Sequence, residues 1–300
     1  MFLLYVGGQG KAGTDLGPHM ILKDEYKLIE QIKDMGYSVQ FDGHERFNNL
    51  RPESNQDPDI GKLKNPRYVS NVTRVLSKAV EGYCQQGSFP LVLGGDHSLA
   101  IGTISGALAK YPDACVIWVD AHADVNTPET TDSGNIHGCP VSFLTGIAGK
   151  VESFEWVPAC LAWDRLAYIG LRDVDTPEKA ILREHNVAAF SMHHVDKYGI
   201  GKVVEMALER VNPGLKRPIY LSFDVDAMDP AIAPSTGTPV RGGLSWREAM
   251  FICEAVAETG CLIGMDLMEI NPALEDEVSV EETISAGCSL VRCALGESLL

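Results

Sequence analysis

Short apolar runs alternate with amphipathic stretches along this 300-residue chain, and that alternation constrains its fold more than any other feature. The runs are apolar at nearly every position, as in strands that a parallel sheet buries on both faces. We expect strands at residues 2–6, 38–41, 91–93, 115–119, 166–171, 188–190, 218–223 and 261–267. Because no linker-like segment separates them, the pattern predicts one α/β domain over residues 1–300, with helices on both faces of a parallel sheet.

Several stretches between the apolar runs begin with helix-start signals. Asn65 precedes a proline and then an apolar face with a 3.6-residue period. The S-x-x-E capping-box pattern occurs at residues 245–248 and at residues 279–282. Residues 200–211 show another amphipathic period. In such folds the functional groups lie in loops beyond the carboxyl ends of the strands, so we look for polar clusters there.

The charge balance excludes several classes of partner. Lys and Arg number 25 against 41 Asp and Glu, so the formal charge is −16, which disfavours nucleic acid and anionic membranes and favours a cationic small molecule. We find no run of 18 uncharged apolar residues, and residues 1–6 are too short for a secretory signal. The eight cysteines are scattered without C-x-x-C spacing, as in a reduced protein. We therefore expect a cytoplasmic protein, unless a terminal segment outside this sequence directs it to an organelle.

One glycine pattern admits two interpretations. Gly8-x-Gly10-x-x-Gly13 follows the first predicted strand and matches the dinucleotide-binding fingerprint, which needs a helix to begin immediately afterwards. A Gly-Pro pair at residues 17–18 interrupts any such helix. We therefore favour a loop that borders a site over an NAD-binding motif.

Aspartates and histidines cluster where three predicted strands end. Together these ends supply His97, Asp120, His122, Asp124, Asp224 and Asp226. If strand geometry continues beyond residue 119, side chains spaced by two residues point to the same side. Each residue alone would commonly be a turn or cap residue, but gathering four carboxylates without a counter-charge is costly. The set therefore predicts a metal site.

The ligand types indicate which metal the site would hold. Carboxylates with two imidazoles and no thiolate suit a six-coordinate divalent ion such as Mn²⁺ better than structural zinc. Six ligands exceed the needs of one catalytic ion, whereas two ions that share carboxylates at roughly 3.5–4 Å use them all. A water between two such ions loses a proton near neutral pH. We therefore predict two Mn²⁺ per chain and hydrolytic chemistry.

Four further residues fit a hydrolytic site. His137 lies on a loop shortly after the predicted ligands and could move protons. Glu269 ends the last predicted strand, where it could hold a cationic group. Asp173 and Asp175 end another strand and could bind an ammonium group. Each of them could equally be a loop residue that satisfies backbone donors.

Four sequence blocks resemble the signature blocks of the ureohydrolases, and within that group those of the arginase family. They are GGDHS at 94–98, DAHAD at 120–124, SFDVD at 222–226 and MEINP at 268–272. The similarity begins at the glycine-rich loop near residue 7 and extends over nearly the whole chain. It implies an arginase-like, three-layer α/β/α fold and hydrolysis of L-arginine to L-ornithine and urea by a hydroxide that bridges two Mn²⁺ ions. Its physiological role would be either the disposal of nitrogen as urea or the supply of ornithine as a polyamine precursor.

The resemblance also implies roles for individual residues. One Mn²⁺ would be held by His97, Asp120, Asp124 and Asp224, and the other by Asp120, His122, Asp224 and Asp226. Asp124 and His137 would transfer protons, and Glu269 would face the guanidinium group. The substrate α-carboxylate would be bound by Asn126, Thr131, Ser133 and Asn135, the α-amino group by Asp173, Asp175 and Glu178, with Thr238 beside them. The resemblance further implies a homotrimer with Arg247 and Glu248 at its interface.

Three other functions are compatible with parts of this pattern. A ureohydrolase for agmatine or guanidinobutyrate would cleave the same bond with the same ligands. A metal-dependent deacetylase on a related fold would not need the small polar residues or Glu269. A catalytically silent scaffold would be expected to lose ligands, and none of the six positions is substituted.

Overall fold

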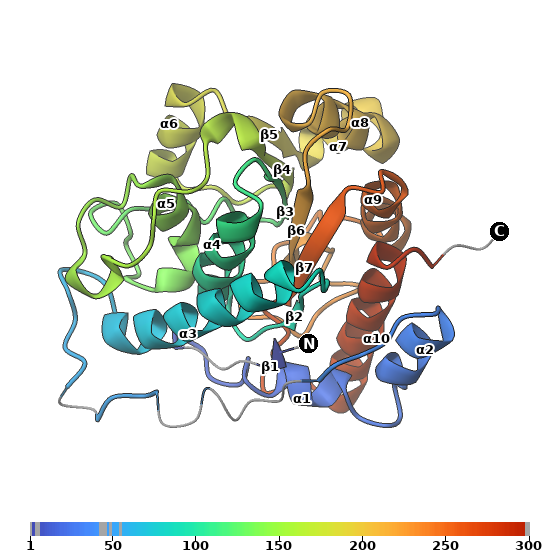
Figure 1. The fold of residues 1–300 in the computed structure, drawn as a ribbon, viewed down its shortest axis with the longest axis horizontal. Helices are drawn as coiled ribbons and strands as arrows, with labels where there is room; N and C mark the ends of the chain where they lie inside the picture. Colours follow the sequence, from blue (N-terminus) through green and yellow to red (C-terminus); the bar gives the residue numbers. More distant parts are fainter. Residues whose placement is uncertain (1, 4–6, 42–46, 48–49, 54–55, 298–300) are drawn as a thin grey trace.

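A computed structural model describes residues 2–3, 7–41, 47, 50–53 and 56–297. Within them one parallel sheet has the strand order β1-β2-β7-β6-β3-β4-β5 (Figure 1). The strands are β1 (Phe2–Leu3), β2 (Leu91–Leu93), β3 (Cys115–Val119), β4 (Leu166–Leu171), β5 (Ala188–Ser191), β6 (Ile219–Asp224) and β7 (Leu262–Met268). The sheet places β7, β6 and β3 at its centre, between strands that are distant in sequence.

Helices cover both faces of the sheet, which confirms the predicted three-layer α/β/α arrangement. One layer contains α3 (Pro66–Gln85), α4 (Ala100–Lys110), α5 (Pro140–Thr145) and α6 (Thr176–Glu184). The other contains α1 (Gly17–Ile21), α2 (Leu28–Asp34), α7 (Met192–Tyr198), α8 (Ile200–Val211), α9 (Trp246–Glu258) and α10 (Glu277–Ala294). In Figure 1 the two layers lie on opposite sides of the strands. No helix among the described residues has the length and apolar character needed to cross a membrane.

The central strands explain why the apolar runs lack alternation. In β3, Cys115, Ile117 and Val119 pack into the core shared with α8, α9 and α10. Val116 and Trp118 of the same strand pack into the core shared with α3 and α4. All five side chains are buried, so both faces of the strand need apolar residues.

The predicted strand at residues 38–41 is wrong. These residues form no strand, and Phe41 is 46% exposed, while only Val39 packs against the core. Side-chain contacts hold this part of the chain: the Tyr37 hydroxyl donates to the Leu295 carbonyl, and Gln40 bonds to the Tyr83 hydroxyl. A short apolar run shows no preference between strand pairing and such contacts. Of the predicted strand at 2–6, residues 4–6 lie outside the described residues.

Two helix starts differ from the predicted ones. Asn65 occupies the position before α3, but its side chain donates to the Gly7 carbonyl instead of capping the helix. The Asp57 carboxylate accepts the first N–H groups of α3, at residues 67 and 68, in its place. Helix α10 begins at Glu277 because Asp276 accepts the Ser279 N–H, three residues earlier than the S-x-x-E pattern indicated. An aspartate upstream supplied the cap in both cases.

The capping box predicted at residues 245–248 is confirmed and allows a stability prediction. Ser245 Oγ accepts the Glu248 N–H at 3.3 Å, and Glu248 Oε2 accepts the Ser245 N–H at 2.8 Å. Ser245→Ala removes one of these bonds, so we expect it to lower the free energy of unfolding by about 1 kcal/mol in urea denaturation. Ser285→Ala, on the exposed side of α10, is the control and should change it little. Equal destabilisation by both substitutions would contradict the capping role.

Candidate metal centre and substrate pocket

The predicted ligands meet at the carboxyl edge of four adjacent strands. His97 follows β2, Asp120 follows β3, Asp224 ends β6, and Glu269 follows β7. His97 Nδ1 lies 3.1 Å from Asp224 Oδ2, 3.2 Å from Asp120 Oδ2 and 3.4 Å from Asp124 Oδ2. One imidazole nitrogen thus faces three carboxylates, an arrangement that could hold a metal ion.

A second group of ligand atoms lies beside the first and shares Asp120 with it. His122 Nδ1 lies 3.1 Å from Asp226 Oδ2 and 3.4 Å from Asp120 Oδ1. Asp120 therefore presents one carboxylate oxygen to each histidine. Asp120, His122 and Asp226 form the second set that could hold an ion. All six predicted ligands belong to this double cluster, which we call the ligand cluster.

The ligands after β3 converge through a turn, so the expected continuation of strand geometry is wrong. Strand β3 ends at Val119. Asp120 Oδ1 then accepts the His122 N–H at 2.7 Å, which folds the chain back. Asp124 has a φ of 51°, in the left-handed region that non-glycine residues seldom adopt. The turn brings Asp120, His122 and Asp124 together. In an extended strand, residues spaced by two would lie more than about 6 Å apart.

Burial makes the ligand cluster electrostatically costly by itself. The side chains of Asp120, Asp124, Asp224 and Asp226 are buried. Burial and neighbouring carboxylates raise the pKa of Asp124 and of Asp224 well above the usual range. Burial also opposes ionisation of Asp120, but hydrogen bonds from His122 and His97 outweigh it and lower the pKa of that carboxyl. Divalent cations would supply the missing positive charge, so the donor set fits them.

Residues behind His97 orient its ring, and sequence reasoning missed them. Ser222 Oγ donates to Asp266 Oδ1 at 2.6 Å and lies 2.8 Å from His97 Nε2. Ser222 therefore accepts the Nε2–H bond and directs Nδ1 toward the carboxylates, where that nitrogen could bind a metal ion. The ring also stacks on Trp118 at 4.1 Å, and the Trp118 indole donates to Asp120 Oδ2. The available sequence signal was Asp266 itself, an acid within a buried apolar strand.

A cavity of about 250 Å³ opens beside the ligand cluster. Predicted site residues that line it are His122, Asp124, Asn126, Thr131, Ser133, His137, Asp173, Asp175, Glu178, Asp224 and Thr238. Asp132 and Gly138 also line it and were not predicted. Of the remaining predicted residues, His97, Asp120, Asp226 and Glu269 lie buried outside the lining, and Asn135 lies next to Gly10. The structure thus brings most of the predicted residues to one cavity.

Glu269 has one carboxylate oxygen in use and one without a partner. Its Oε1 accepts the His97 N–H at 2.9 Å and lies 3.0 Å from His137 Nδ1. Its Oε2 is buried and has no hydrogen-bond partner among the described residues. Burial opposes protonation of His137, but Glu269 reverses the effect and raises the pKa of that imidazole. A buried oxygen without a donor is costly, so this atom is suited to receive a donor from a ligand.

The residues predicted to bind the α-amino group also hold each other in place. Glu178 Oε1 accepts the Val125 N–H and Oε2 accepts the Asp175 N–H, so this carboxylate joins α6 to the loop after β3. Burial raises the pKa of Glu178 to about 7. Asp175 caps α6, is exposed, and accepts a bond from Asn126 Nδ2 at 2.9 Å. Asp173 is exposed at the rim, with its side chain 66% accessible.

Two loops complete the walls of the site. Thr238 Oγ1 donates to Asp226 Oδ2 at 2.8 Å, so it orients a predicted ligand. The Gly8 N–H donates to Asp96, and the Gly8 carbonyl accepts the His137 N–H. Residues 7–16 form no helix, and α1 begins only at Gly17. The glycine pattern is therefore a loop beside the site, as favoured from the sequence.

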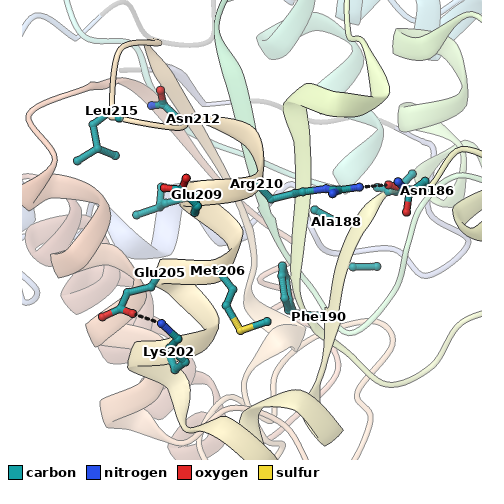
Figure 2. Close-up of a pocket in the computed structure, with 14 residues that line it drawn as sticks. Asn186, Ala188, Phe190, Lys202, Glu205, Met206, Glu209, Arg210, Asn212 and Leu215 are labelled. Carbon is teal, nitrogen blue, oxygen red and sulfur yellow. Dashed lines mark hydrogen bonds and ion pairs between the residues drawn. The ribbon is translucent and has the colours of Figure 1, made fainter.

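A larger cavity, about 1110 Å³, lies elsewhere, between β5 and α8 (Figure 2). Phe190 and Met206 form part of its apolar wall, and Lys202 pairs with Glu205 at its edge. No predicted site residue lines it. Although this cavity is larger, its lining gives no link to the ligand cluster.

Comparisons with known proteins agree with this geometry. The family model described as Arginase family matches residues 4–296. The arginase of Glaciozyma antarctica is 54% identical over 300 residues, which cover 99% of this chain and 86% of the relative. An arginase of Schizosaccharomyces pombe is 52% identical over 297 residues, covering 99% and 91% respectively. A solved arginase structure from Bacillus caldovelox matches with a TM-score of 0.89 at 33% identity, covering 100% of this chain and 97% of that one. This chain therefore belongs to the arginase family.

Proposed function

We propose that this protein hydrolyses L-arginine to L-ornithine and urea with two Mn²⁺ ions bound in the ligand cluster. The observation that carries the proposal is Asp120, whose two oxygens face two separate histidines, one of which, His122, lines a small polar cavity. Relatives about 50% identical to this chain carry the name arginase, which supports the same reaction. The six carboxylates of the cavity lining favour a cationic substrate.

The proposed metal ligands combine the two atom groups with the ligand sets that the family resemblance implies. One ion would be held by His97, Asp120, Asp124 and Asp224, and the other by Asp120, His122, Asp224 and Asp226. When bound, the pair would lower the pKa of a shared water and so provide the hydroxide nucleophile for the guanidinium carbon. Mn²⁺ suits this set because it accepts both imidazole nitrogen and carboxylate oxygen.

Three residues of the chain would then handle the substrate and its protons. Glu269 Oε2, which has no donor, would accept an N–H of the guanidinium group. Asp124 lines the cavity and would carry a proton toward the departing amine. His137 lines the same cavity and contacts Glu269, so it would exchange protons between the site and solvent.

The two ends of the amino acid would be bound by different loops. Asn126, Thr131, Ser133 and Asn135 offer neutral donors for the α-carboxylate, and three of them line the cavity. Asp173, Asp175 and Glu178 offer acceptors for the α-amino group. The bond between Asn126 and Asp175 joins the two sets, so both ends of the substrate would be held in a fixed relation.

Substrate choice tests the proposal. We expect kcat/KM for L-arginine to exceed that for agmatine by at least about a hundredfold, because agmatine lacks the carboxylate and would leave buried donors unpaired. Urea release from both compounds, measured side by side with Mn²⁺-loaded protein, decides this. Equal or faster hydrolysis of agmatine, or of guanidinobutyrate, would instead support a ureohydrolase for a shortened substrate.

The homotrimer and the cytoplasmic location expected above stay predictions. Arg247 lies on α9 with its side chain 66% exposed and forms a two-bond ion pair with Glu254. Glu248 is partly exposed and takes part in the capping box of the same helix. Both residues thus make contacts within the chain, and Arg247 is the more exposed of the two at the start of α9.

A further inference from the structure

A short segment before α3, residues 57–65, packs against the site and is firmly anchored; we call it the strap. At its start the Asp57 carboxylate accepts two N–H groups of α3. In its middle Ile60 and Leu63 exchange two backbone hydrogen bonds of 3.1 and 3.0 Å. Leu63 is fully buried in the core beneath α3. The strap is thus fixed independently of the site.

The strap supports the loop at residues 127–135, which carries three of the four proposed carboxylate donors, Thr131, Ser133 and Asn135. Lys62 Nζ donates to the Thr131 carbonyl at 2.9 Å and to the Glu129 carbonyl at 3.0 Å. The Lys64 N–H donates to the Gly134 carbonyl at 2.9 Å. Gly134 has a φ of +74°, and a Cβ there would lie only 2.0 Å from the Lys62 carbonyl oxygen. Strap and loop are therefore in close backbone contact.

The loop depends on such support because its own bonds are local. The Thr127 N–H donates to Thr130 Oγ1, and the Gly134 N–H donates to Thr131 Oγ1. These bonds shape turns but do not fix the loop relative to the cavity. The Lys62 ammonium holds the main-chain carbonyl of Thr131, a residue that lines the cavity, and so fixes the backbone at that position.

Lys62 also brings positive charge to this side of the cavity. The lining residues include six carboxylates and no lysine or arginine. The Lys62 ammonium lies 4.0 Å from Asp132 Oδ1, on the loop that would meet the substrate carboxylate. A cation here offsets repulsion that the acidic cavity would otherwise exert on a carboxylate.

We propose that Lys62 is a positioning residue that sets the affinity of the site for the α-carboxylate of its substrate. It acts through the backbone of the 127–135 loop and contributes a positive charge behind it. The inference rests on the proposed function, because it assumes an α-amino acid in the cavity. It assigns part of the substrate selectivity to a residue outside the cavity lining.

Steady-state kinetics of Mn²⁺-loaded Lys62→Met test the proposal. We expect KM for L-arginine to rise about three- to tenfold, as for the loss of charged hydrogen bonds at a partly exposed site, with kcat within about twofold. The dissociation constant of L-ornithine, measured by calorimetry, should rise by the same factor. The inhibition constant of agmatine, which has no carboxylate, should stay unchanged. Lys62→Arg should restore most of the affinity, since it keeps both the charge and the donors.

Lys64→Met is the matched control, because it removes the same charge two residues away and keeps the Lys62 ammonium. It should leave KM unchanged. The proposal is overturned if Lys62→Met binds ornithine as well as the parent protein does, or if it weakens agmatine as much as ornithine. Failure of the parent protein to hydrolyse arginine would instead count against the proposed function, whatever the Lys62 variants show.

Discussion

Asp120→Ala is expected to abolish arginine hydrolysis and to remove most of the bound metal. Asp120 is shared by both groups of ligand atoms, and each of its oxygens faces a different histidine. Its loss removes a ligand from both proposed ions and one negative charge that balances them. Substitution of a residue that only orients a metal ligand typically lowers metal affinity by about 10–100-fold. Loss of a ligand shared by both ions should therefore lower the metal affinity by more than about a hundredfold. Metal analysis after gel filtration, together with urea release, measures both effects.

A matched carboxylate at the opposite end of β3 serves as the control. Asp113 precedes the strand, is 73% exposed and lies 3.4 Å from Arg217. Asp113→Ala should keep full activity and full metal content. Two tightly bound Mn²⁺ per chain in Asp120→Ala would show that the assignment of the shared ligand is wrong.

His137→Asn is expected to lower kcat by roughly 10²–10⁴-fold while the metal content stays constant. That range is the usual contribution of a general acid or base. His137 lies outside both groups of ligand atoms, and its Nδ1 contacts Glu269. Asparagine can still donate to Glu269 but cannot gain or lose a proton near neutral pH. The pH dependence of kcat should accordingly lose the limb that reports this imidazole.

His185→Asn provides the comparison, because that imidazole stacks on Trp163 at the far end of α6. It should behave like the parent protein. Loss of manganese from His137→Asn would make this residue a ligand and remove it from the proton-transfer role. An unchanged kcat would exclude it from both roles.

Much of the fold could be predicted because buried parallel strands have a local sequence signal, a short run that is apolar at every position. A run such as 115–119 is apolar at every position because both faces of β3 are covered by helices. The run at 38–41 pairs with no strand; its Gln40 bonds to Tyr83 of α3, and the preceding Tyr37 bonds to the Leu295 carbonyl at the end of α10. Whether a sheet edge accepts a short segment depends on groups elsewhere in the chain, and a local pattern does not contain them.

The candidate ligands could also be identified in advance, for a topological reason. His97, Asp120 and Asp224 lie at the ends of strands that are distant in sequence, and a parallel sheet brings such ends to one edge. The spacing of residues 120–124 suggested convergence for the wrong reason, because a turn with Asp124 in the left-handed region produces it. The residue types were therefore more informative than the assumed geometry.

The sequence by itself determined which chemical groups reach this edge: carboxylates and imidazoles at the strand ends, with small polar residues on the following loop. Only the tertiary structure decided which of these groups contact one another. It placed Asp120 between both histidines, with Ser222 and Asp266 behind His97. It left Glu269 Oε2 without a donor among the described residues. It also brought Lys62 against a loop some seventy residues further along the chain. Each of these depends on a hydrogen bond or contact between segments far apart in the chain, whose distance and direction are set by the packing of the whole sheet. Periodicity and spacing report only on neighbours along the chain, so they identify the donors and acceptors but not the pairs that they form.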